Sequence, residues 1–263
     1  MNKYWIDSHA HLASDELFEK FEEVVANARA MEVGKINIIC GELREFDRVL
    51  PLIEGNTMFD ISLGVHPMGV QEVDEKSLEI MRTHYSHPQV VCVGEIGLDY
   101  YWDETYIDLQ HEILKRHIKI ANEFELPVAI HLRDKAGSRR AVDDLIQILT
   151  DYPVQKKGVI HCYSDTVENA KTFLGMGYYL GFGGVLTFKN GDNVKAVLEI
   201  TPEDKMITET DSPYLAPVPM RGKRNQPGFV SYVGKYINNH FGKDTQEKLM
   251  DNYYALFNKS KRV

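Results

Sequence analysis

The chain has 263 residues, of which 43% are hydrophobic and 26% charged, a composition typical of a folded globular protein rather than a disordered one. This length lies in the range that an α/β barrel occupies as one unit, so we expect residues 1–263 to form a single domain. The formal net charge of −9 repels polyanions at long range, so any binding of nucleic acid needs a local basic patch or bound metal.

The sequence also indicates where the protein works. It has no run of about 18 apolar residues, and residues 1–7 lack the basic flank and apolar stretch of a signal peptide. We therefore expect a cytoplasmic protein with no membrane contact, and no obligate protein partner is evident. Cys40, Cys92 and Cys162 form no metal-binding or redox pair, so we expect buried, reduced thiols.

Short β-rich runs recur about every thirty residues, and most are separated by stretches with helical spacing of apolar residues. This alternation is typical of repeated β-α units with a parallel sheet. The eight predicted strands are residues 4–9, 35–40, 59–65, 90–96, 127–131, 158–162, 178–182 and 205–209.

The first predicted helix begins after Ser14 as a candidate N-cap, and Gly34 follows it as a stop. A last helix is expected to close the outside of the molecule. The other predicted helices and this last one are residues 42–53, 75–85, 105–125, 138–149, 166–176, 193–200, 230–239 and 245–257.

Eight such units fit either an open doubly wound sheet or a closed (β/α)8 TIM barrel. In an open sheet, the site forms between two strands at a switch point. Here, candidate ligands follow the C-terminal ends of many strands, and only a closed ring brings those ends together. The sequence therefore favours a TIM barrel with its site at the C-terminal ends of the strands.

Two histidines and a glutamate stand at the ends of the first and fourth predicted strands. His9 and His11 are two residues apart, so in an extended chain they point to the same side and can bind one ion. Glu95 lies among apolar neighbours, where an unpaired carboxylate is costly and a pair of cations would remove that cost. Taken singly, each could also be a surface, capping or ion-paired residue.

His131 and His161 occupy equivalent places at the ends of the fifth and sixth predicted strands, and Asp211 follows the eighth. With His9, His11 and Glu95 they form a mixed nitrogen and oxygen set that suits Zn²⁺, Mn²⁺, Co²⁺ or Ni²⁺ and tolerates Mg²⁺ less well. Six ligands exceed one open catalytic zinc site, whereas two cations about 3.5–4 Å apart that share Glu95 would use them all and activate a water. Asp211 could then accept the proton of that water.

These residues lie in motifs that resemble the TatD family of metal-dependent hydrolases over nearly the whole chain. The motifs are Asp7-Ser8-His9-Ala10-His11-Leu12, Gly64-Val65-His66-Pro67, Gly94-Glu95-Ile96-Gly97-Leu98-Asp99-Tyr100, His131-Leu132-Arg133-Asp134, His161-Cys162-Tyr163-Ser164, Glu209-Thr210-Asp211-Ser212-Pro213-Tyr214-Leu215 and Arg221-Gly222-Lys223-Arg224-Asn225.

The resemblance implies a TIM barrel whose first metal takes His9, His11, Glu95 and Asp211, and whose second takes Glu95, His131 and His161. It also implies a divalent-metal-dependent deoxyribonuclease that trims DNA from the 3′ end. Gln226, where the family often has an acid, and Tyr163, where phenylalanine is common, depart from the pattern without touching a proposed ligand.

The loops supply candidate partners for a phosphodiester, which needs cationic or N–H groups beside the metals. These candidates are His66, Arg133, Arg221 and Arg224, and the last two could equally belong to a solvated loop. Tyr100, Tyr101 and Trp102 follow Glu95 and could either stack on a base or cap the barrel.

The leading hypothesis is therefore a deoxyribonuclease that acts on DNA ends, with Glu95 and Asp211 as its catalytic carboxylates. The alternative is hydrolysis of a small ester, lactone or amide on the same centre, because activated water attacks carbonyl groups as well as phosphorus. A third hypothesis, a non-catalytic binding protein, is disfavoured because structural metal sites are usually closed.

Overall fold

A computed structural model of the chain describes residues 3–263. Residues 1–2, part of the N-terminal stretch that was predicted to lack the features of a signal peptide, lie outside that range. Eight parallel strands are hydrogen-bonded in chain order, so each strand pairs with the next one along the sequence. They are β1 (Trp5–Ala10), β2 (Val33–Cys40), β3 (Phe59–Leu63), β4 (Val90–Asp99), β5 (Val128–Arg133), β6 (Gly158–Ile160), β7 (Tyr179–Phe182) and β8 (Met206–Thr208).

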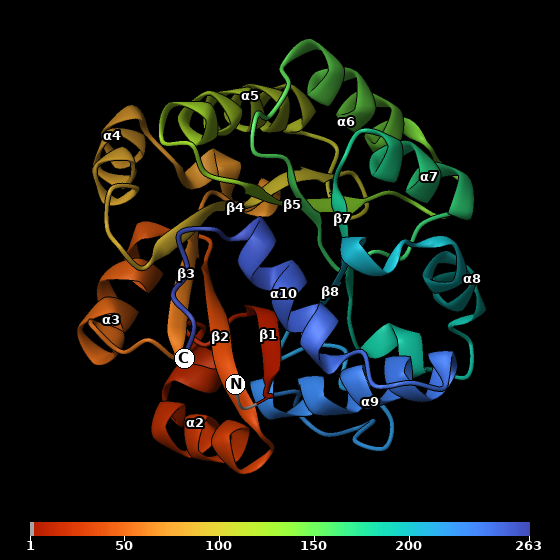
Figure 1. Cartoon of the computed structure of the whole chain (residues 1–263). Helices are drawn as coiled ribbons and strands as arrows, with labels where there is room; N and C mark the ends of the chain where they lie inside the picture. The colour runs from red at the N-terminus through yellow and green to blue at the C-terminus, as the bar shows by residue number, and fades with distance from the viewer. Residues whose placement is uncertain (1–2) are drawn as a thin grey trace.

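All of the longer helices except the last lie outside the ring of strands in the order of the chain, as Figure 1 shows. Their apolar faces pack on the strands, whose residues are almost all buried. The α-helices are α1 (Asp15–Phe18), α2 (Phe21–Ala30), α3 (Leu43–Ile53), α4 (Glu75–His84), α5 (Ile107–Glu123), α6 (Arg140–Asp151), α7 (Val167–Gly175), α8 (Asp192–Ile200), α9 (Val230–Phe241) and α10 (Gln246–Leu256). Short 3-10 segments are η1 (Pro67–Glu72), η2 (Gly184–Thr187), η3 (Glu203–Lys205) and η4 (Pro227–Phe229).

The ring closes where β1 meets the segment that follows β8. Ala10 forms a parallel bridge with Ser212, and the His11 amide donates to the Ser212 carbonyl at 2.9 Å. The Thr208 hydroxyl also donates a hydrogen bond to the Ile6 carbonyl at 3.0 Å. The predicted (β/α)8 barrel is therefore confirmed, and its closure carries the chain after β8 over the end of β1.

The last helix, α10, is placed differently from the prediction. It runs across the ring of strands instead of along its outside (Figure 1). Its Met250, Tyr253 and Leu256 join a cluster with Ile6 of β1 and Ile207 of β8. Because these two residues belong to the interior layer near the N-terminal ends of the strands, α10 seals that end and leaves the C-terminal end for the site.

The start of the chain corrects two further predictions. The first helix is divided into α1 and α2, and Ser14 stands at the N-cap position without a capping side-chain hydrogen bond. Gly34 lies inside β2 instead of stopping a helix, and the left-handed turn falls at Glu32, with φ 62°. A glycine is needed at 34 because a Cβ there would lie 2.5 Å from the Tyr4 ring.

A buried ion pair ties α10 to the strands. The Lys35 ammonium donates to the Thr57 carbonyl at 2.6 Å and lies 3.3 Å from the Asp60 carboxylate. The Tyr253 hydroxyl donates to the same carboxylate at 2.8 Å, and Ser260 also bonds to it. Breaking such a pair leaves one buried charge uncompensated.

We expect Lys35→Met to lower the free energy of unfolding by about 3–5 kcal/mol, because Asp60 then keeps a buried charge without its cation. Chemical denaturation measures this loss. The double variant Lys35→Met with Asp60→Leu, which removes both charges, should recover much of the stability. A single variant as stable as the wild type would show that the pair is not needed.

Candidate metal centre

The junction of β1 with the segment after β8 brings three predicted ligands together. The Asp7 carboxylate accepts hydrogen bonds from the Thr210 amide at 2.8 Å and the Thr210 hydroxyl at 2.6 Å. The Asp211 amide donates to the His9 carbonyl at 2.9 Å. The Asp211 carboxylate consequently lies 3.4 Å from Nε2 of His11 and 3.9 Å from Nε2 of His9.

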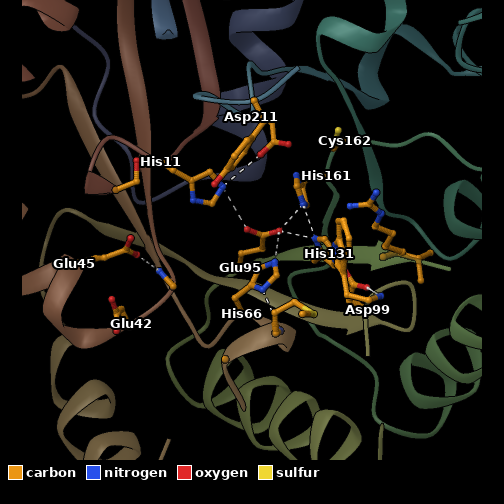
Figure 2. Close-up of a pocket in the computed structure, with 18 of the residues that line it drawn as sticks. His11, Glu42, Glu45, His66, Glu95, Asp99, His131, His161, Cys162 and Asp211 are labelled. Atoms are coloured by element: carbon orange, nitrogen blue, oxygen red, sulfur yellow. Dashed lines mark hydrogen bonds and ion pairs between the residues drawn. The ribbon is translucent and has the colours of Figure 1, made fainter. Parts of the chain in front are cut away.

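Glu95 enters the barrel at an irregularity in β4. Gly94 pairs with Ala129 and Ile96 pairs with Ile130, so Glu95 has no partner of its own in the ladder. Such bulges re-aim side chains and are frequent beside active sites. The Glu95 side chain is 2% exposed, and Figure 2 shows it in the middle of the histidines.

The two carboxylate oxygens of Glu95 face two different groups of histidines. Oε1 lies 2.6 Å from Nε2 of His161 and 2.8 Å from Nδ1 of His131. Oε2 lies 3.3 Å from Nε2 of His9 and 3.7 Å from Nε2 of His11. The structure thus brings all six predicted ligands together, with Glu95 between the two groups.

The ionisable side chains in the cluster shift one another's pKa values. Burial alone would raise the pKa of Glu95, but His161, His66 and His9 outweigh it and hold that pKa well below its usual range. Burial opposes protonation of His11 as well, yet the hydrogen bond with Asp211 and the charge of Glu95 raise its pKa to about 9. The pKa of His9 falls to about 4, through burial first and the neighbouring His161 second.

Several buried polar atoms in this cluster have no hydrogen-bond partner among the described residues. They are both ring nitrogens of His9, Nδ1 of His161 and Oε2 of Glu209. Buried polar atoms without partners are costly, and imidazole nitrogens and carboxylate oxygens are good ligands for transition-metal ions. The residues therefore fit a centre of divalent cations.

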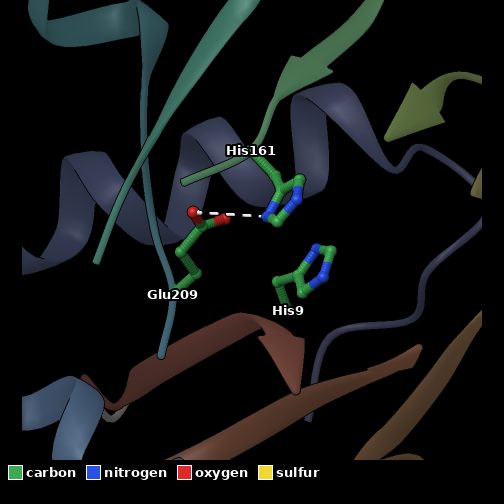
Figure 3. Close-up of side chains that lie close together, drawn as sticks. All are labelled: His9, His161 and Glu209. Atoms are coloured by element: carbon green, nitrogen blue, oxygen red, sulfur yellow. Dashed lines mark ion pairs between the residues drawn. The ribbon is translucent and has the colours of Figure 1, made fainter. Parts of the chain in front are cut away.

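Glu209 was not predicted as a site residue. It is fully buried beside His161 and His9, as Figure 3 shows, and one of its oxygens lies 4.0 Å from Nδ1 of His161. Its other contact is with the amide of Cys162. Burial raises the pKa of Glu209 to about 7. Its place in the Glu209-Thr210-Asp211 run, at a strand end, was the only sequence signal for it.

Asp99 was also missed as a site residue. The His131 ring donates from Nε2 to the Asp99 carboxylate at 2.8 Å, while its Nδ1 faces Glu95. A carboxylate on the second nitrogen of a ligating histidine fixes the ring. The alternation of Glu95, Gly97 and Asp99 along β4 was the signal that could have found it.

We expect Asp99→Asn to weaken metal binding about 10–100-fold, because His131 loses the carboxylate that orients its ring. Titration of metal-depleted protein against a chelating indicator measures the affinity. Asp103→Asn is the matched control, since Asp103 is an exposed carboxylate that accepts from the Thr105 amide and does not line the cavity. Equal affinities for the two variants would contradict the role assigned to Asp99.

A cavity of about 1080 Å³ lies over this cluster at the C-terminal ends of the strands. Of the predicted substrate contacts, His66 and Arg133 line it. Arg221 and Arg224 do not: Arg221 stacks on Phe188, 4.0 Å from its ring centre, and Arg224 donates to the Glu16 carbonyl. Cys40 and Cys92 are buried as expected, whereas Cys162 is partly exposed because it lies at the cavity wall.

His66 accepts a hydrogen bond at Nδ1 from the Met68 amide at 3.1 Å. Burial is the main cause that lowers the pKa of His66 to about 4, so the ring is neutral at neutral pH. A neutral imidazole that accepts at Nδ1 carries its proton on Nε2. That nitrogen lies 3.6 Å from Glu95, so His66 presents an N–H donor to the centre.

A model of the family described as "TatD related DNase" matches residues 6–258. The chain belongs to the TatD family. It is 36% identical over 232 residues to the uncharacterized metal-dependent hydrolase YabD of Bacillus subtilis, covering 88% of this chain and 89% of that protein. It is 34% identical over 261 residues to the uncharacterized metal-dependent hydrolase YcfH of Escherichia coli, covering 97% and 96%.

Solved structures agree with this TatD assignment. The crystal structure of YJJV, a TatD homologue from Escherichia coli K12, superposes with a TM-score of 0.87 at 28% identity and covers 97% of this chain and 98% of its own. The resemblance inferred from the motifs is therefore confirmed, and this chain is a member of the TatD family of metal-dependent hydrolases. No helix within residues 3–263 is long and apolar enough to cross a membrane.

Proposed function

We propose that this TatD-family chain is a deoxyribonuclease of the 3′-exonuclease type that hydrolyses DNA phosphodiester bonds at a centre of two divalent cations. The observation that carries the proposal is Glu95, whose two oxygens face separate histidine groups beneath an open cavity. The description of the matching family as a DNase supports the choice of substrate.

In this proposal His9, His11 and Asp211 would hold one ion, His131 and His161 would hold the other, and Glu95 would serve both. The nitrogen-rich set favours Zn²⁺, Mn²⁺, Co²⁺ or Ni²⁺, with Mg²⁺ as a weaker fit. Bound divalent cations would lower the pKa of a coordinated water and offset the charge of a phosphoryl group.

Asp211 is the proposed proton acceptor. Its side chain is 14% exposed and lines the cavity, so it can reach a water there. Burial would raise the pKa of Asp211, but the hydrogen bond with His11 and the charges of His161 and His9 lower it, so the carboxylate is ionised. As water attacks phosphorus, Asp211 takes its proton and returns it to the leaving oxygen while the P–O bond breaks.

His66 and Arg133 are the proposed partners of the substrate phosphate. His66 offers its Nε2–H beside Glu95, and Arg133 follows His131 by two residues on the same strand, where it lines the cavity. An arginine guanidinium can hold two phosphate oxygens at once.

The first test is digestion of single-stranded DNA that carries a label at one end, with Mg²⁺, Mn²⁺, Zn²⁺, Co²⁺ or Ni²⁺ added to metal-depleted protein. The proposal predicts stepwise shortening from the 3′ end. No cleavage with any of these ions would overturn it. A panel of lactones, esters and amides, assayed in parallel, tests the alternative hydrolase activity, since turnover there without DNA cleavage would support a small-molecule substrate.

The histidine pKa values predict that, as pH rises, the stability of the metal-depleted protein falls while its affinity for metal rises. Burial opposes protonation of His131, but its hydrogen bonds with Asp99 and Glu95 raise its pKa from the ordinary value of 6.5 to about 9. The pKa of His11 is also raised to about 9. A raised folded-state pKa gives stability that is present below pH 6.5 and is lost as pH rises through 9. Metal binding displaces those protons, so affinity for metal should rise over the same window.

We therefore expect the thermal midpoint of chelator-treated protein to fall between pH 6.5 and 9, and the stabilisation by added Mn²⁺ to grow. The double variant His11→Gln, His131→Gln should lose most of the first effect. Below pH 6.5 the lowered pKa values of His9 and His66 make the stability of the metal-depleted protein rise with pH instead of fall. The thermal midpoints are therefore compared only between pH 6.5 and 9. A midpoint that rises from pH 6.5 to 9 without metal would contradict this assignment.

A further inference from the structure

The cavity mouth beside β4 and β5 carries an exposed aromatic pair. Trp102 is 63% exposed and Tyr101 is 39% exposed, with ring centres 4.8 Å apart and planes at 86°. The Arg133 guanidinium lies 4.1 Å from the Tyr101 ring centre and 5.2 Å from that of Trp102. Trp102 and Arg133 line the same cavity as Glu95, so a ligand that fills this cavity can contact all three residues.

The neighbouring Tyr100 is a different kind of residue. It is buried, and its hydroxyl bonds to His111 and to Asp144. Of the three aromatic residues after β4, Tyr100 therefore packs the barrel, whereas Trp102 leaves most of its ring in solvent at the cavity. A large exposed indole at a site of this kind offers a flat apolar surface to a ligand.

Arg133 is a cation without a carboxylate partner. Within residues 3–263 no acidic side chain lies at ion-pair distance from it, whereas the nearby Lys135 and Arg140 both pair with Glu104. An arginine held over aromatic rings and free of carboxylates is ready to bind an anion. The mouth therefore places an anion-binding group beside a stacking surface.

The rim that follows β2 has the opposite charge. Glu42, Arg44 and Glu45 line the cavity there, and Arg44 pairs with Glu42 at 3.0 Å, which offsets one of the two acidic charges and leaves a net negative charge. Figure 2 shows Glu42 and Glu45 on the far side of Glu95 from His131 and Asp99. The backbone of Arg133 lies opposite that of Asp99 in the β4–β5 ladder, so Arg133 belongs to the His131 side of the cavity. A polyanion is repelled on the acidic side and attracted on the Arg133 side, so its remaining chain should leave the centre over Arg133 and Trp102.

We propose that Trp102 is a stacking platform for an unpaired nucleobase of the strand being cut, with Arg133 holding an adjoining phosphate. The proposal rests on the deoxyribonuclease function above and identifies the residue that selects unpaired nucleotides. Bases inside a duplex have both faces covered by their neighbours, so only an unpaired base can lay a face on the indole. Stacking on an aromatic side chain tolerates any base, since every base has a π-face.

The experiment compares two substrates that share phosphates and differ in bases: an oligothymidylate and an abasic oligomer of the same length. Wild-type protein with Mn²⁺ is expected to cleave the oligothymidylate with about tenfold higher kcat/KM, the effect of stacking one base. Trp102→Leu should lose this preference through a higher KM for the oligothymidylate and should cleave the abasic oligomer as the wild type does. Trp102 is largely exposed, so its removal leaves the fold intact.

Tyr152→Leu is the matched control. Tyr152 is an exposed aromatic residue, 48% accessible, at the end of α6 and away from the cavity lining. This variant should keep the wild-type preference. If the wild type cleaves both oligomers equally, or Trp102→Leu keeps the preference, the stacking proposal is wrong while the nuclease function stands. If the wild type cleaves neither with any divalent metal, the nuclease function itself fails.

Tryptophan fluorescence gives a second, non-catalytic readout. The chain has two tryptophans, and Trp5 is buried, so a bound base can quench only Trp102 by stacking. The oligothymidylate is expected to quench the emission of Asp211→Asn protein, and the abasic oligomer is not. Binding of the oligothymidylate without quenching would contradict a base on Trp102.

Discussion

Glu95→Gln is expected to reduce the metal content from about two equivalents to one or fewer and to lower turnover on the order of 10³-fold. The amide keeps the shape of the side chain but loses the charge that both histidine groups face. Two ions at close distance then repel each other without the shared carboxylate between them. Elemental analysis of protein purified without chelator, beside rates on labelled DNA, measures both effects.

Glu72→Gln is the control for this experiment, because Glu72 also lines the cavity but lies at the end of η1 and is not one of the six proposed ligands. It should retain the wild-type metal content. Full metal content in Glu95→Gln, with the rate unchanged, would show that Glu95 does not join two ions and would leave the cluster as a set of separately held histidines.

Asp211→Asn is expected to lower kcat on the order of 10²- to 10⁴-fold, the range for loss of a general base. Asparagine suits this position because Asp211 has φ 56°, a left-handed conformation that asparagine tolerates. The backbone bond from Asp211 to His9 does not depend on the side chain, so the fold should persist. Rates are compared at saturating Mn²⁺, so that weaker metal binding does not enter the result.

The pH–rate profile separates a proton acceptor from a purely structural ligand. In the wild type, the acidic limb of the profile should follow protonation of a group with a lowered pKa, as Asp211 has. In Asp211→Asn this limb should disappear from the residual activity. An unchanged kcat would favour the hypothesis of a non-catalytic binding protein.

The periodic signals in the sequence were sufficient for the architecture. Strands buried on both faces read as continuous apolar runs, and the polar residues after them marked the C-terminal end of the ring. The position of α10 could not be predicted in the same way. An apolar helix face fits either the outside of a barrel or its open end, and only the tertiary contacts of Met250 and Tyr253 with the strand interiors decide between them.

The candidate site shows the same division. The six proposed ligands could be predicted because each lies at or just after the end of an apolar run, where a polar side chain is conspicuous. They are His9, His11, Glu95, His131, His161 and Asp211. Asp99 and Glu209 were missed because their importance depends on contacts across strands, with His131 and His161. Arg221 and Arg224 were chosen for their charge and their place in a loop, and neither reveals that their side chains turn toward Phe188 and α1.

The most direct test of the two-ion centre is a crystal structure of protein loaded with Mn²⁺, with anomalous diffraction data collected to locate the ions. Two anomalous peaks about 3.5–4 Å apart are expected, one beside His9 and His11 and the other beside His131 and His161, with Glu95 between them. A single peak, or two peaks that Glu95 does not join, would contradict the two-ion centre.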